Sequence, residues 1–437
     1  MLILADWLIA EPGEPPLKGA GVRVVGDRIE AVGPSAELRA AHPTDEVVHA
    51  TGKVLAPGFV NAHVHLYGVL AHGIPLPNTP DGFWSFLGDF WWPKVEDALD
   101  HRMIATATEW VGAELLRTGT TGFYDILEAP NAVPGALLMQ MDVVEKLGLR
   151  GILSFEATER VSAENGALGL MENLAMIKAG REPGGSGLVT GAMCFHTTFT
   201  CPPPFIEQAF DLAKEHGVFC HAHVNEGTHE GKWCEKHHGM RTVELYERMG
   251  VLSDRFLASQ CVQVSDNERR LLVERGVRIV SMPLANCEVG GGIAPVPELV
   301  DAGATVALGS DGYVNDFFEV MRGAFLLHKG RLCNPQVMPA AQVFRMATFG
   351  GAQALGWTDV GALRSGFAAD LQLIDAAFPT MATPHNLYDQ LVLWRNGRDV
   401  TDVMVAGRWR VRNGELLGVD IPALRARVAE EAERLWA

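Results

Sequence analysis

The chain of 437 residues carries 36 lysines and arginines against 53 aspartates and glutamates, a formal net charge of −17 at pH 7. Nucleic acids and anionic membrane surfaces are bound by clustered basic side chains, so this charge argues against either partner. The hydrophobic fraction of 48% suits a well-packed globular chain, and no apolar run reaches the length of a membrane-spanning helix. Together with seven scattered cysteines that lack the spacing of a disulfide framework, these features predict a cytoplasmic protein.

The first predicted elements are strands of a small β-domain. The stretch GVRVVGDRIEAVG alternates apolar and polar residues on both sides of a tight turn at residues 26–27, which is the pattern of a β-hairpin. Near the other end of the chain, VMVAGRWRVRNGEL repeats this pattern around residues 406–407. We therefore predict one composite β-sandwich domain built from both termini.

Between these ends, short apolar runs alternate with longer helical patterns. The runs are VLAPGFVNAHVH, TTGFYDIL, GLRGILSFEAT, LVTGAMCFHT, GVFCHAHVN, RFLASQCVQ, VRIVSMPLAN and TVALGSDG. Eight alternations of this length predict an α/β fold of the (β/α)8 TIM-barrel type, whose active site lies at the carboxyl ends of the strands. The predicted parts of the chain are the β-sandwich at 1–56 and 366–420, the barrel at 57–365 and a C-terminal helix at 421–437.

A long insertion at residues 66–98 separates the first predicted strand from the first predicted helix. Its aromatic residues are Trp84, Phe86, Phe90, Trp91 and Trp92. Loops of this length in compact domains tend to be functional, so we expect a lid over the active site or a subunit contact. Extra packing over the rim of the barrel is an equally open interpretation.

Histidines and a carboxylate stand at the ends of three predicted strands. His63 and His65 end the first run two residues apart, so their side chains point to the same face of a strand. His223 ends the fifth run and Asp311 ends the eighth. Three imidazoles and one carboxylate, with an open position for water, suit a catalytic divalent metal ion. A single such residue is more often structural, and it is their shared location at strand ends that favours a metal site.

Longer motifs resemble a known family. VLAPGFVNAHVH, HVNEG and VALGSDG are similar to the signature stretches of the amidohydrolase superfamily. GGGIAPVPELVDAGATVALGSDG and GALRSGFAADLQLID resemble its aminohydrolase and chlorohydrolase branch, which includes guanine deaminase, adenosylhomocysteine deaminase and the triazine hydrolases. FWSFLGDFWWPKVEDALD and GSDGYVNDFFEVMRGAFLLHK are most similar to aminohydrolases of the SsnA type. The resemblance covers nearly the whole chain and does not specify a substrate.

The resemblance implies a metal-dependent deaminase that releases ammonia from an aminated nitrogen heterocycle such as a purine, pteridine, pyrimidine or triazine. His63, His65, His223 and Asp311 would hold one Zn²⁺, or alternatively Fe²⁺, and lower the pKa of bound water to about 7 so that metal-bound hydroxide attacks. Glu226 would donate a proton to a ring nitrogen and pass protons to the leaving group. Asp311 would also accept the proton of the attacking water.

The number of metal ions and the surrounding contacts follow from the same resemblance. Members of the superfamily that bind two metals use a carboxylated lysine on a middle strand, and the third and fourth runs contain no interior lysine. We therefore expect one divalent ion per chain. His196, which ends the fourth run, matches a position that often contacts substrate, although an orienting role is equally open. A homo-oligomer, either dimer or tetramer, is implied by the resemblance alone.

The sixth run departs from the pattern of the branch. It reads FLASQCVQVS, with Gln260 where deaminases of this branch usually have a histidine. Glutamine forms hydrogen bonds but does not titrate near neutrality, so we predict that Gln260 positions the substrate without transferring protons. Three functions stay open, in this order: a deaminase that relies on Glu226 and Asp311, a non-deaminating hydrolase such as a dechlorinase or cyclic amidohydrolase, and a non-catalytic metal-stabilised binding protein.

Overall fold

The computed structural model describes residues 1–76 and 78–437. Residue 77, which falls within the predicted insertion, lies outside the described residues. The chain divides into two compact units. The first consists of Met1–Ala62, Ala113–Phe123 and Val314–Val419, and the second of His63–Gly112, Tyr124–Tyr313 and Asp420–Ala437. The three-part division inferred from the sequence stays a prediction.

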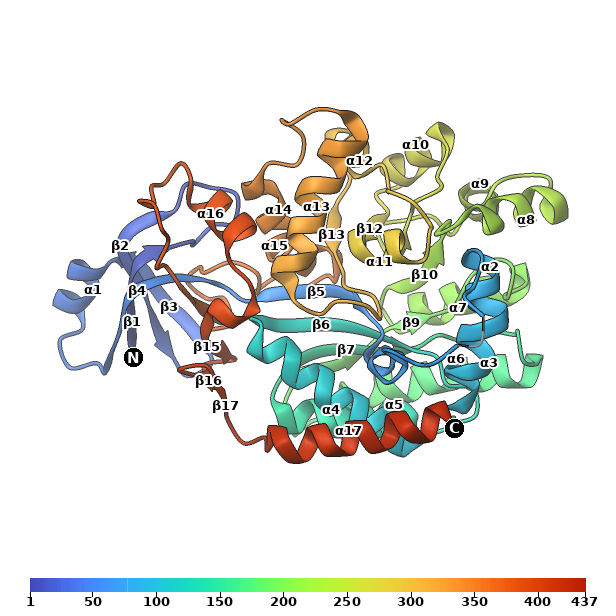
Figure 1. The fold of residues 1–437 in the computed structure, drawn as a ribbon, viewed down its shortest axis with the longest axis horizontal. Helices are drawn as coiled ribbons and strands as arrows, with labels where there is room; N and C mark the ends of the chain where they lie inside the picture. The colour runs from blue at the N-terminus through green and yellow to red at the C-terminus, as the bar shows by residue number, and fades with distance from the viewer. Residues whose placement is uncertain (77) are drawn as a thin grey trace. The chain divides into compact units, whose positions relative to one another are not determined.

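The first unit is built around one eight-stranded sheet in the order β17-β16-β15-β14-β4-β1-β2-β3 (Figure 1). Its strands are β1 Leu2–Leu8, β2 Leu17–Val25, β3 Arg28–Pro34, β4 Val47–Pro57, β14 Leu371–Asp375, β15 Val400–Val405, β16 Arg408–Arg412 and β17 Glu415–Leu416. Both predicted hairpins are present, because β2 pairs with β3 and β15 pairs with β16 across the expected turns. Strands from the two ends of the chain join where β14 pairs with β4.

An apolar core lies against this sheet. Alternate residues of its strands are buried together, among them Ile3, Val22, Leu55, Leu371 and Met404. The turns of the two hairpins meet, since a Cβ at Gly407 would overlap the carbonyl oxygen of Gly26. Gly407 also has φ +73°, a conformation that glycine adopts without strain. The sheet therefore joins strands from both ends of the chain around this core, while the bounds of the predicted composite domain stay a prediction.

The remaining strands form the barrel. They are β5 Phe59–Val64, β6 Thr120–Leu127, β7 Arg150–Phe155, β8 Val189–Gly191, β9 Met193–Cys194, β10 Cys220–Val224, β11 Phe256–Gln260, β12 Arg278–Ser281 and β13 Val306–Leu308. Hydrogen bonding runs in the orders β5-β6-β7-β8 and β9-β10-β11-β12-β13. Isolated bridges from Val64 to Asp311 and from Ala157 to Phe195 link the two sets. The strands thus close on themselves, and the predicted (β/α)8 barrel is confirmed.

Two of the predicted strands are divided in the structure. The first run was expected to be one strand, but its residues up to Pro57 belong to β4 and the barrel strand β5 begins at Phe59. The break falls at Gly58, where a Cβ would overlap the side chain of Thr121. The fourth run is divided at Ala192 into β8 and β9. Close approach of neighbouring chain segments, which the apolar pattern does not encode, decides the first break.

Helices separate the barrel strands and follow them toward the C-terminus. They include α4 His101–Arg117, α5 Ala136–Leu147, α6 Ala163–Ala179, α7 Pro203–Glu215, α8 Thr228–His238, α9 Thr242–Met249, α10 Asp266–Glu274, α11 Pro283–Glu288, α12 Val296–Asp301 and α17 Ile421–Trp436. The first unit contains α1 Ser35–Ala41, α13 Phe317–Leu332, α14 Ala340–Met346, α15 Phe349–Ala354 and α16 Leu387–Trp394. Left-handed glycines end α5, α8 and α9, as helix C-termini commonly require. None of the helices in the described part of the chain is long and apolar enough to cross a membrane.

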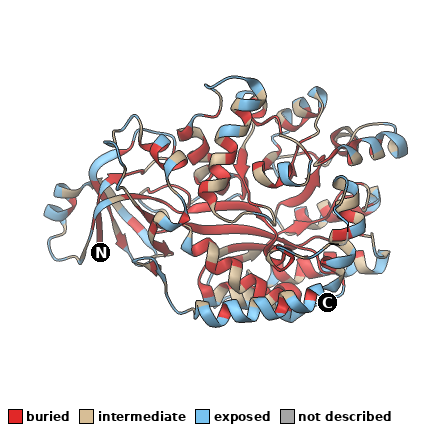
Figure 2. Ribbon diagram, viewed as in Figure 1, coloured by how far each residue is buried: buried red, intermediate tan, exposed pale blue. Residues whose placement is uncertain are grey.

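Burial follows the layers of the barrel. Figure 2 shows the barrel strands buried along their length, whereas α17 is exposed along its outer face. Every residue of β5, β6, β10 and β11 is buried, which is typical of strands covered on both faces. Polar side chains at the ends of such strands are therefore surrounded by protein, and their charges interact strongly.

The insertion at 66–98 is largely helical, whereas a long loop was predicted. Its described elements are the 3-10 helix η1 Leu66–Ala71, α2 Phe83–Ser85, the π-helix η2 Phe86–Trp91, α3 Trp92–Lys94 and the 3-10 helix η3 Glu96–Ala98. Aromatic residues one turn apart pack on each other, since the ring of Phe86 lies 5.6 Å from Phe90 and 5.4 Å from Trp91. These contacts stabilise short helical turns, which the sequence does not predict because the segment has no regular helical spacing of apolar residues.

Candidate active site

The predicted metal ligands come together at the carboxyl ends of β5, β10 and β13. Nε2 of His63 lies 3.3 Å from Nε2 of His65. The carboxylate of Asp311 lies 3.4 Å from Nε2 of His65 and 4.0 Å from Nε2 of His63. One ring nitrogen each of His63, His65 and His223 falls within 4.8 Å of the others. All three histidines are buried, so the structure places the four residues at one site.

Local backbone geometry brings these side chains together. Gly309 lies against His63, and a Cβ there would stand 2.8 Å from the Cβ of His63. Gln260 and Asp311, at the ends of β11 and just after β13, have φ angles of +71° and +60°. A residue other than glycine in this region costs about 1–3 kcal/mol, and such residues cluster at functional sites. The strand ends therefore hold strained backbone where the candidate side chains converge.

The donor set fits a divalent metal ion. Nδ1 of His65 donates to the carbonyl oxygen of Ile126 at 2.7 Å, so the neutral ring presents an unprotonated Nε2 toward His63 and Asp311. Two nitrogen ligands on one tetrahedral zinc, each about 2.0–2.1 Å from the ion, are about 3.3 Å apart, which matches the separation between His63 and His65. A cation between these residues would bind the lone pairs of the imidazole nitrogens and of the Asp311 carboxylate, which otherwise face one another.

Glu226 follows His223 by three residues and is half-buried at the same end of the barrel. Burial, and next the charge of Asp311, raise the pKa of Glu226 to about 8. A Cβ at Gly291 would lie 2.6 Å from the carbonyl oxygen of Glu226, so the glycine-rich loop packs directly on this turn. At neutral pH a carboxyl group with this pKa carries its proton and can act as a general acid.

Gln260 contacts the candidate catalytic carboxylate. Its Nε2 donates to Oδ2 of Asp311 at 2.8 Å. Because an ionised carboxylate only accepts hydrogen bonds, the amide nitrogen must face Asp311. Oε1 of Gln260 is buried without a hydrogen-bond partner among the described residues. Gln260 thus presents an acceptor, which is the property that a substrate N–H requires.

His196 and Glu156 lie on the other side of His223. Nδ1 of His196 is 2.8 Å from Oγ1 of Thr200, and its Nε2 is 3.6 Å from Oε1 of Glu156. The same Oε1 lies 2.8 Å from Nδ1 of His223. Burial would raise the pKa of Glu156, but the charges of His223 and His196 lower it to about 2. The carboxylate is therefore ionised beside both histidines.

Glu156 was not selected by the sequence analysis. Its position in the sequence could have indicated it. Glu156 directly follows β7, and the predicted ligands likewise lie at or just after the ends of their strands. Glu156, His196 and His223 form a second group whose ligand atoms lie within 4.8 Å of one another. Active-site residues of such barrels come from the carboxyl ends of the strands, and Glu156 lies at one of these ends.

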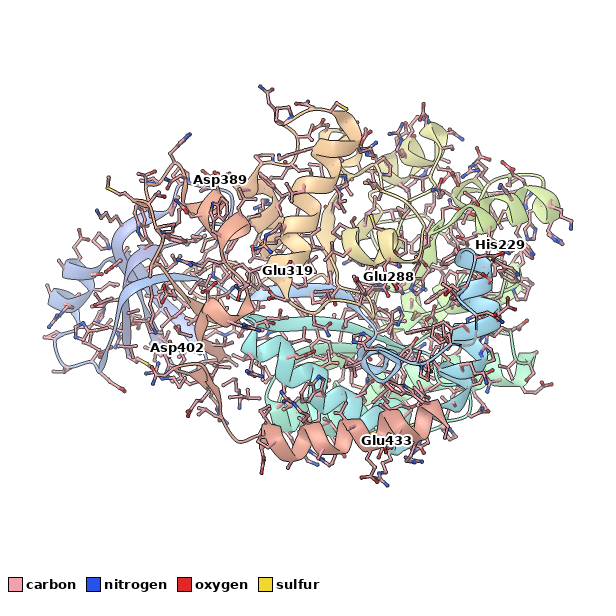
Figure 3. All side chains as sticks on the ribbon, viewed as in Figure 1. His229, Glu288, Glu319, Asp389, Asp402 and Glu433 are labelled. Atoms are coloured by element: carbon pink, nitrogen blue, oxygen red, sulfur yellow. The ribbon has the colours of Figure 1, made fainter. Side chains whose placement is uncertain are left out.

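The insertion contributes an aromatic rim to this face. Trp84 stacks on His229 with ring centres 4.1 Å apart and lies 5.8 Å from Phe199, while Trp92 lies 5.9 Å from His196. Figure 3 shows His229 beside α2 and Glu288 on α11. Burial, and next the charge of Asp311, raise the pKa of Glu288. The aromatic rings of the insertion thus reach Phe199, His229 and His196.

A buried arginine anchors the insertion. Nη2 of Arg160 lies 2.8 Å from Oδ1 of Asp97 and 3.3 Å from Oε2 of Glu96, and its Nε donates to Glu128. The guanidinium also lies 5.1 Å from the ring centre of Trp92. Burial would lower the pKa of Arg160, but the carboxylates raise it, so the arginine stays charged. These contacts support packing of the insertion over the rim, while its roles as lid or subunit contact stay predictions.

A closed barrel with buried histidines and an aspartate converging at the carboxyl ends of its strands defines an enzyme of the metal-dependent barrel type. The chain belongs to the amidohydrolase family, whose profile matches residues 54–410. A second profile, for the bacterial imidazolonepropionase-like composite domain, matches residues 20–44. The resemblance inferred from the sequence motifs is confirmed.

Relatives and solved structures similar to the chain extend over nearly its whole length. The 5-methylthioadenosine/S-adenosylhomocysteine deaminase of Pelotomaculum thermopropionicum is 32% identical over 99% of this chain and 97% of the relative. The 5'-deoxyadenosine deaminase of Methanothermobacter thermautotrophicus is 33% identical over 85% of both chains. The crystal structure of an adenosine deaminase from Xanthomonas campestris, with bound zinc, has a TM-score of 0.88 and 26% identity and covers 99% of this chain and 98% of that one.

Proposed function

We propose that the protein is a hydrolytic deaminase that releases ammonia from an aminated nitrogen heterocycle, with adenosine-like nucleosides as the first candidates. The observation that carries this proposal is the convergence of buried His63, His65 and His223 with half-buried Asp311, beside Glu226, whose pKa is raised to about 8. The curated relatives, which are named as deaminases of adenosine derivatives at about this chain's full length, support the choice of substrate class.

The metal site is assigned to residues of the second unit. His63, His65, His223 and Asp311 would hold one divalent ion, zinc by preference because a zinc-bound structure is similar to this chain, although the same ligands suit Fe²⁺. Such an ion, when bound, activates water as a nucleophile near neutral pH. The side chains of the protein then have to supply only the proton transfers of the reaction.

Two carboxyl groups divide those proton transfers. Glu226 donates its proton to the ring nitrogen next to the aminated carbon, which makes that carbon more electrophilic. Asp311 accepts one proton of the attacking water and returns it to the departing amino group, which leaves as ammonia. Glu226 recovers its own proton from the hydroxyl group that becomes the carbonyl of the product. Gln260 holds Asp311 through Nε2 and offers Oε1 to a substrate N–H. His196 is proposed to contact the heterocycle from the side of the aromatic rim.

Ammonia release tests this proposal directly. Zinc-loaded and iron-loaded protein would be incubated with 5'-deoxyadenosine, 5'-methylthioadenosine, adenosine, guanine, a pterin, an aminopyrimidine and an aminotriazine. We expect release from at least one compound. The variant Glu226→Gln should retain metal and lose about 10²–10⁴-fold in kcat, the range of a general acid or base. Undiminished turnover in that variant would exclude the proton role of Glu226.

A non-deaminating hydrolase is the second candidate, and Gln260 is the observation that favours it. An amide cannot titrate where the branch usually has a histidine, so a bond that needs less proton transfer could be the one cleaved. The product separates the two functions, because a dechlorinase releases chloride and a cyclic amidohydrolase forms a carboxylate in place of ammonia. A non-catalytic binding protein would show saturable ligand binding with no product.

We further infer a homo-oligomer in the cytoplasm with a small heterocyclic substrate as its partner. The described cysteines are all free, and five of the seven are buried, which supports a reducing compartment. The oligomer rests on the family resemblance and would be measured as the native mass in solution. A monomer at micromolar concentration would contradict it.

A further inference from the structure

Glu156 occupies a specific position within the site. It is 2% exposed and lies near two histidines, one just after β9 and one on β10. Its Oε1 is 2.8 Å from Nδ1 of His223 and 3.6 Å from Nε2 of His196. The first separation is that of a hydrogen bond, although the two groups lack its usual alignment, so their attraction is mainly electrostatic.

The chemistry of the pair fixes the state of His223. Ionised carboxylate oxygens carry only lone pairs, so a ring nitrogen 2.8 Å away must hold its hydrogen. With Nδ1 protonated, only Nε2 of the ring can offer a lone pair to a cation. The ring of His223 lies 5.0 Å from that of His63 and stacks on that of His65 at 5.5 Å and 9°. Nε2 is thus the nitrogen that would bind the same ion as the two histidines of β5, with the ion taking the place of its proton.

We propose that Glu156 is a positioning residue that holds His223 as the Nδ1–H tautomer and thereby sets the affinity of the site for its metal ion. The inference rests on the proposed function and its metal ligands, and it adds Glu156 as a residue that contacts one of these ligands without binding the ion. Carboxylates that contact a ligand histidine in this way raise its basicity and fix its ring, and their loss typically weakens metal binding about 10–100-fold.

Glu128 provides a matched control. It directly follows β6, one strand before Glu156, and it is equally buried. Its partner is Arg160, and no ligand histidine is among its contacts in the described residues. Replacing Glu128 therefore removes a buried carboxylate from the same end of the barrel without changing the contact of Glu156 with Nδ1 of His223.

The test is zinc affinity, measured on metal-free protein by competition with a chromogenic chelator. The variants are Glu156→Ala, Glu156→Gln, Glu128→Gln and His223→Ala. We expect Glu156→Ala to weaken zinc binding about 10–100-fold. Glu156→Gln should weaken it less, because the amide keeps an oxygen of the same size beside Nδ1 but lacks the negative charge. Glu128→Gln should stay within about threefold of the parent. Thermal unfolding of each metal-free variant reports whether the fold is retained.

Three results would overturn the inference, and they are distinguishable. Wild-type zinc affinity in both Glu156 variants, with a raised KM, would make Glu156 a substrate contact. Two zinc ions per parent chain that fall to one in Glu156→Ala would make Glu156, His196 and His223 a second metal site. Unchanged affinity in His223→Ala would instead reject the proposed ligand set itself. If Glu156→Ala does not fold, the isosteric Glu156→Gln variant decides alone.

Discussion

Gln260 and Asp311 act as a pair at the residue scale. Nε2 of Gln260 donates to Asp311 at 2.8 Å, and both residues are held at positive φ where their strands end. The usual histidine of this position is thus replaced by a group that orients the carboxylate but does not exchange its own proton. The effect of Gln260 on catalysis can be measured separately from metal binding, because its amide contacts no other described side chain of the ligand set.

Substitution of Gln260 tests this role. Hydrogen bonds to charged groups contribute about 1.5–3 kcal/mol, so Gln260→Ala should lower kcat/KM by about 10–100-fold and leave bound metal unchanged. Steady-state kinetics and metal analysis measure both quantities. Gln263→Ala is a suitable control, since the Gln263 amide donates to the backbone of Gly291 instead. Unchanged kinetics in Gln260→Ala would leave the amide without a catalytic role.

Asp125 is a buried acid that the proposed chemistry does not use. Its carboxylate accepts from the backbone N–H of Leu66 at 2.8 Å and from Nε2 of Gln140 at 2.7 Å. Burial outweighs these bonds and raises the pKa of Asp125 to about 7. Because the folded protein binds the proton more tightly than the unfolded chain, this group stabilises the fold at low pH, and that contribution is lost as the pH rises from about 4 through about 7.

The variant Asp125→Asn should remove this pH dependence. One pKa unit corresponds to about 1.4 kcal/mol, so the free energy of unfolding of the parent should fall by up to about 4 kcal/mol, relative to the variant, between pH 4 and pH 8. Denaturant titrations at several pH values measure this difference. Asp266→Asn, at a side chain 97% exposed, is the control. Parallel pH profiles for parent and Asp125→Asn would refute the assignment.

At the scale of elements, the ends of β6 and β7 hold the insertion in place. Arg160 follows β7 and is 8% exposed, and it contacts Glu128 after β6 together with Glu96 and Asp97 of η3. Burial, and next the charge of Glu128, raise the pKa of Glu96. One cation thus balances carboxylates from two segments of the chain, η3 and the end of β6, and ties both to the end of β7.

Arg160→Met should loosen the insertion. Removing one partner of a buried ion pair costs about 3–5 kcal/mol, because the other charges stay buried. We expect faster amide hydrogen exchange across η2 and η3 and a lower free energy of unfolding, with the barrel strands less affected. Arg270→Met, which removes an exposed pair with Glu274 on α10, should change stability by about 1 kcal/mol or less. Equal exchange in both variants would show that the anchor is dispensable.

At the scale of the whole molecule, metal binding should contribute to stability. The proposed ligands all belong to the second unit, although His63 and Asp311 are far apart in the chain, so they adopt one geometry only in the folded state. A ligand that binds only the folded state stabilises it by about 2.7 kcal/mol at 100 times its dissociation constant.

Removal of the metal should therefore lower Tm. For a protein of this size we expect a decrease of several degrees on chelation, reversed by added zinc, in differential scanning calorimetry. His63→Ala should show little further decrease on chelation because it has lost the ion already. An identical Tm with and without chelator, in protein shown to contain zinc beforehand, would argue against a metal bound by the folded state.

Much of the fold is determined locally, and the sequence alone predicts it. Apolar runs of strand length, helical spacing between them and glycines past helix ends indicate the barrel, because these patterns follow from backbone periodicity. The tight turns at 26–27 and 406–407 likewise indicate the hairpins of the first unit. His63 and His65 were selected by the same reasoning, since two residues separate side chains on one face of a strand.

Only the tertiary structure decided the contacts between segments that are distant in the chain. Glu156 beside His223, Arg160 against Glu96 and Gln260 on Asp311 each depend on which strand ends meet and at what height. The break at Gly58 depends in the same way on the approach of Thr121. Strand order and register depend on how all the strands pack together, so no single segment of the sequence specifies them. The apolar periodicity of a segment, in contrast, can be read from that segment alone.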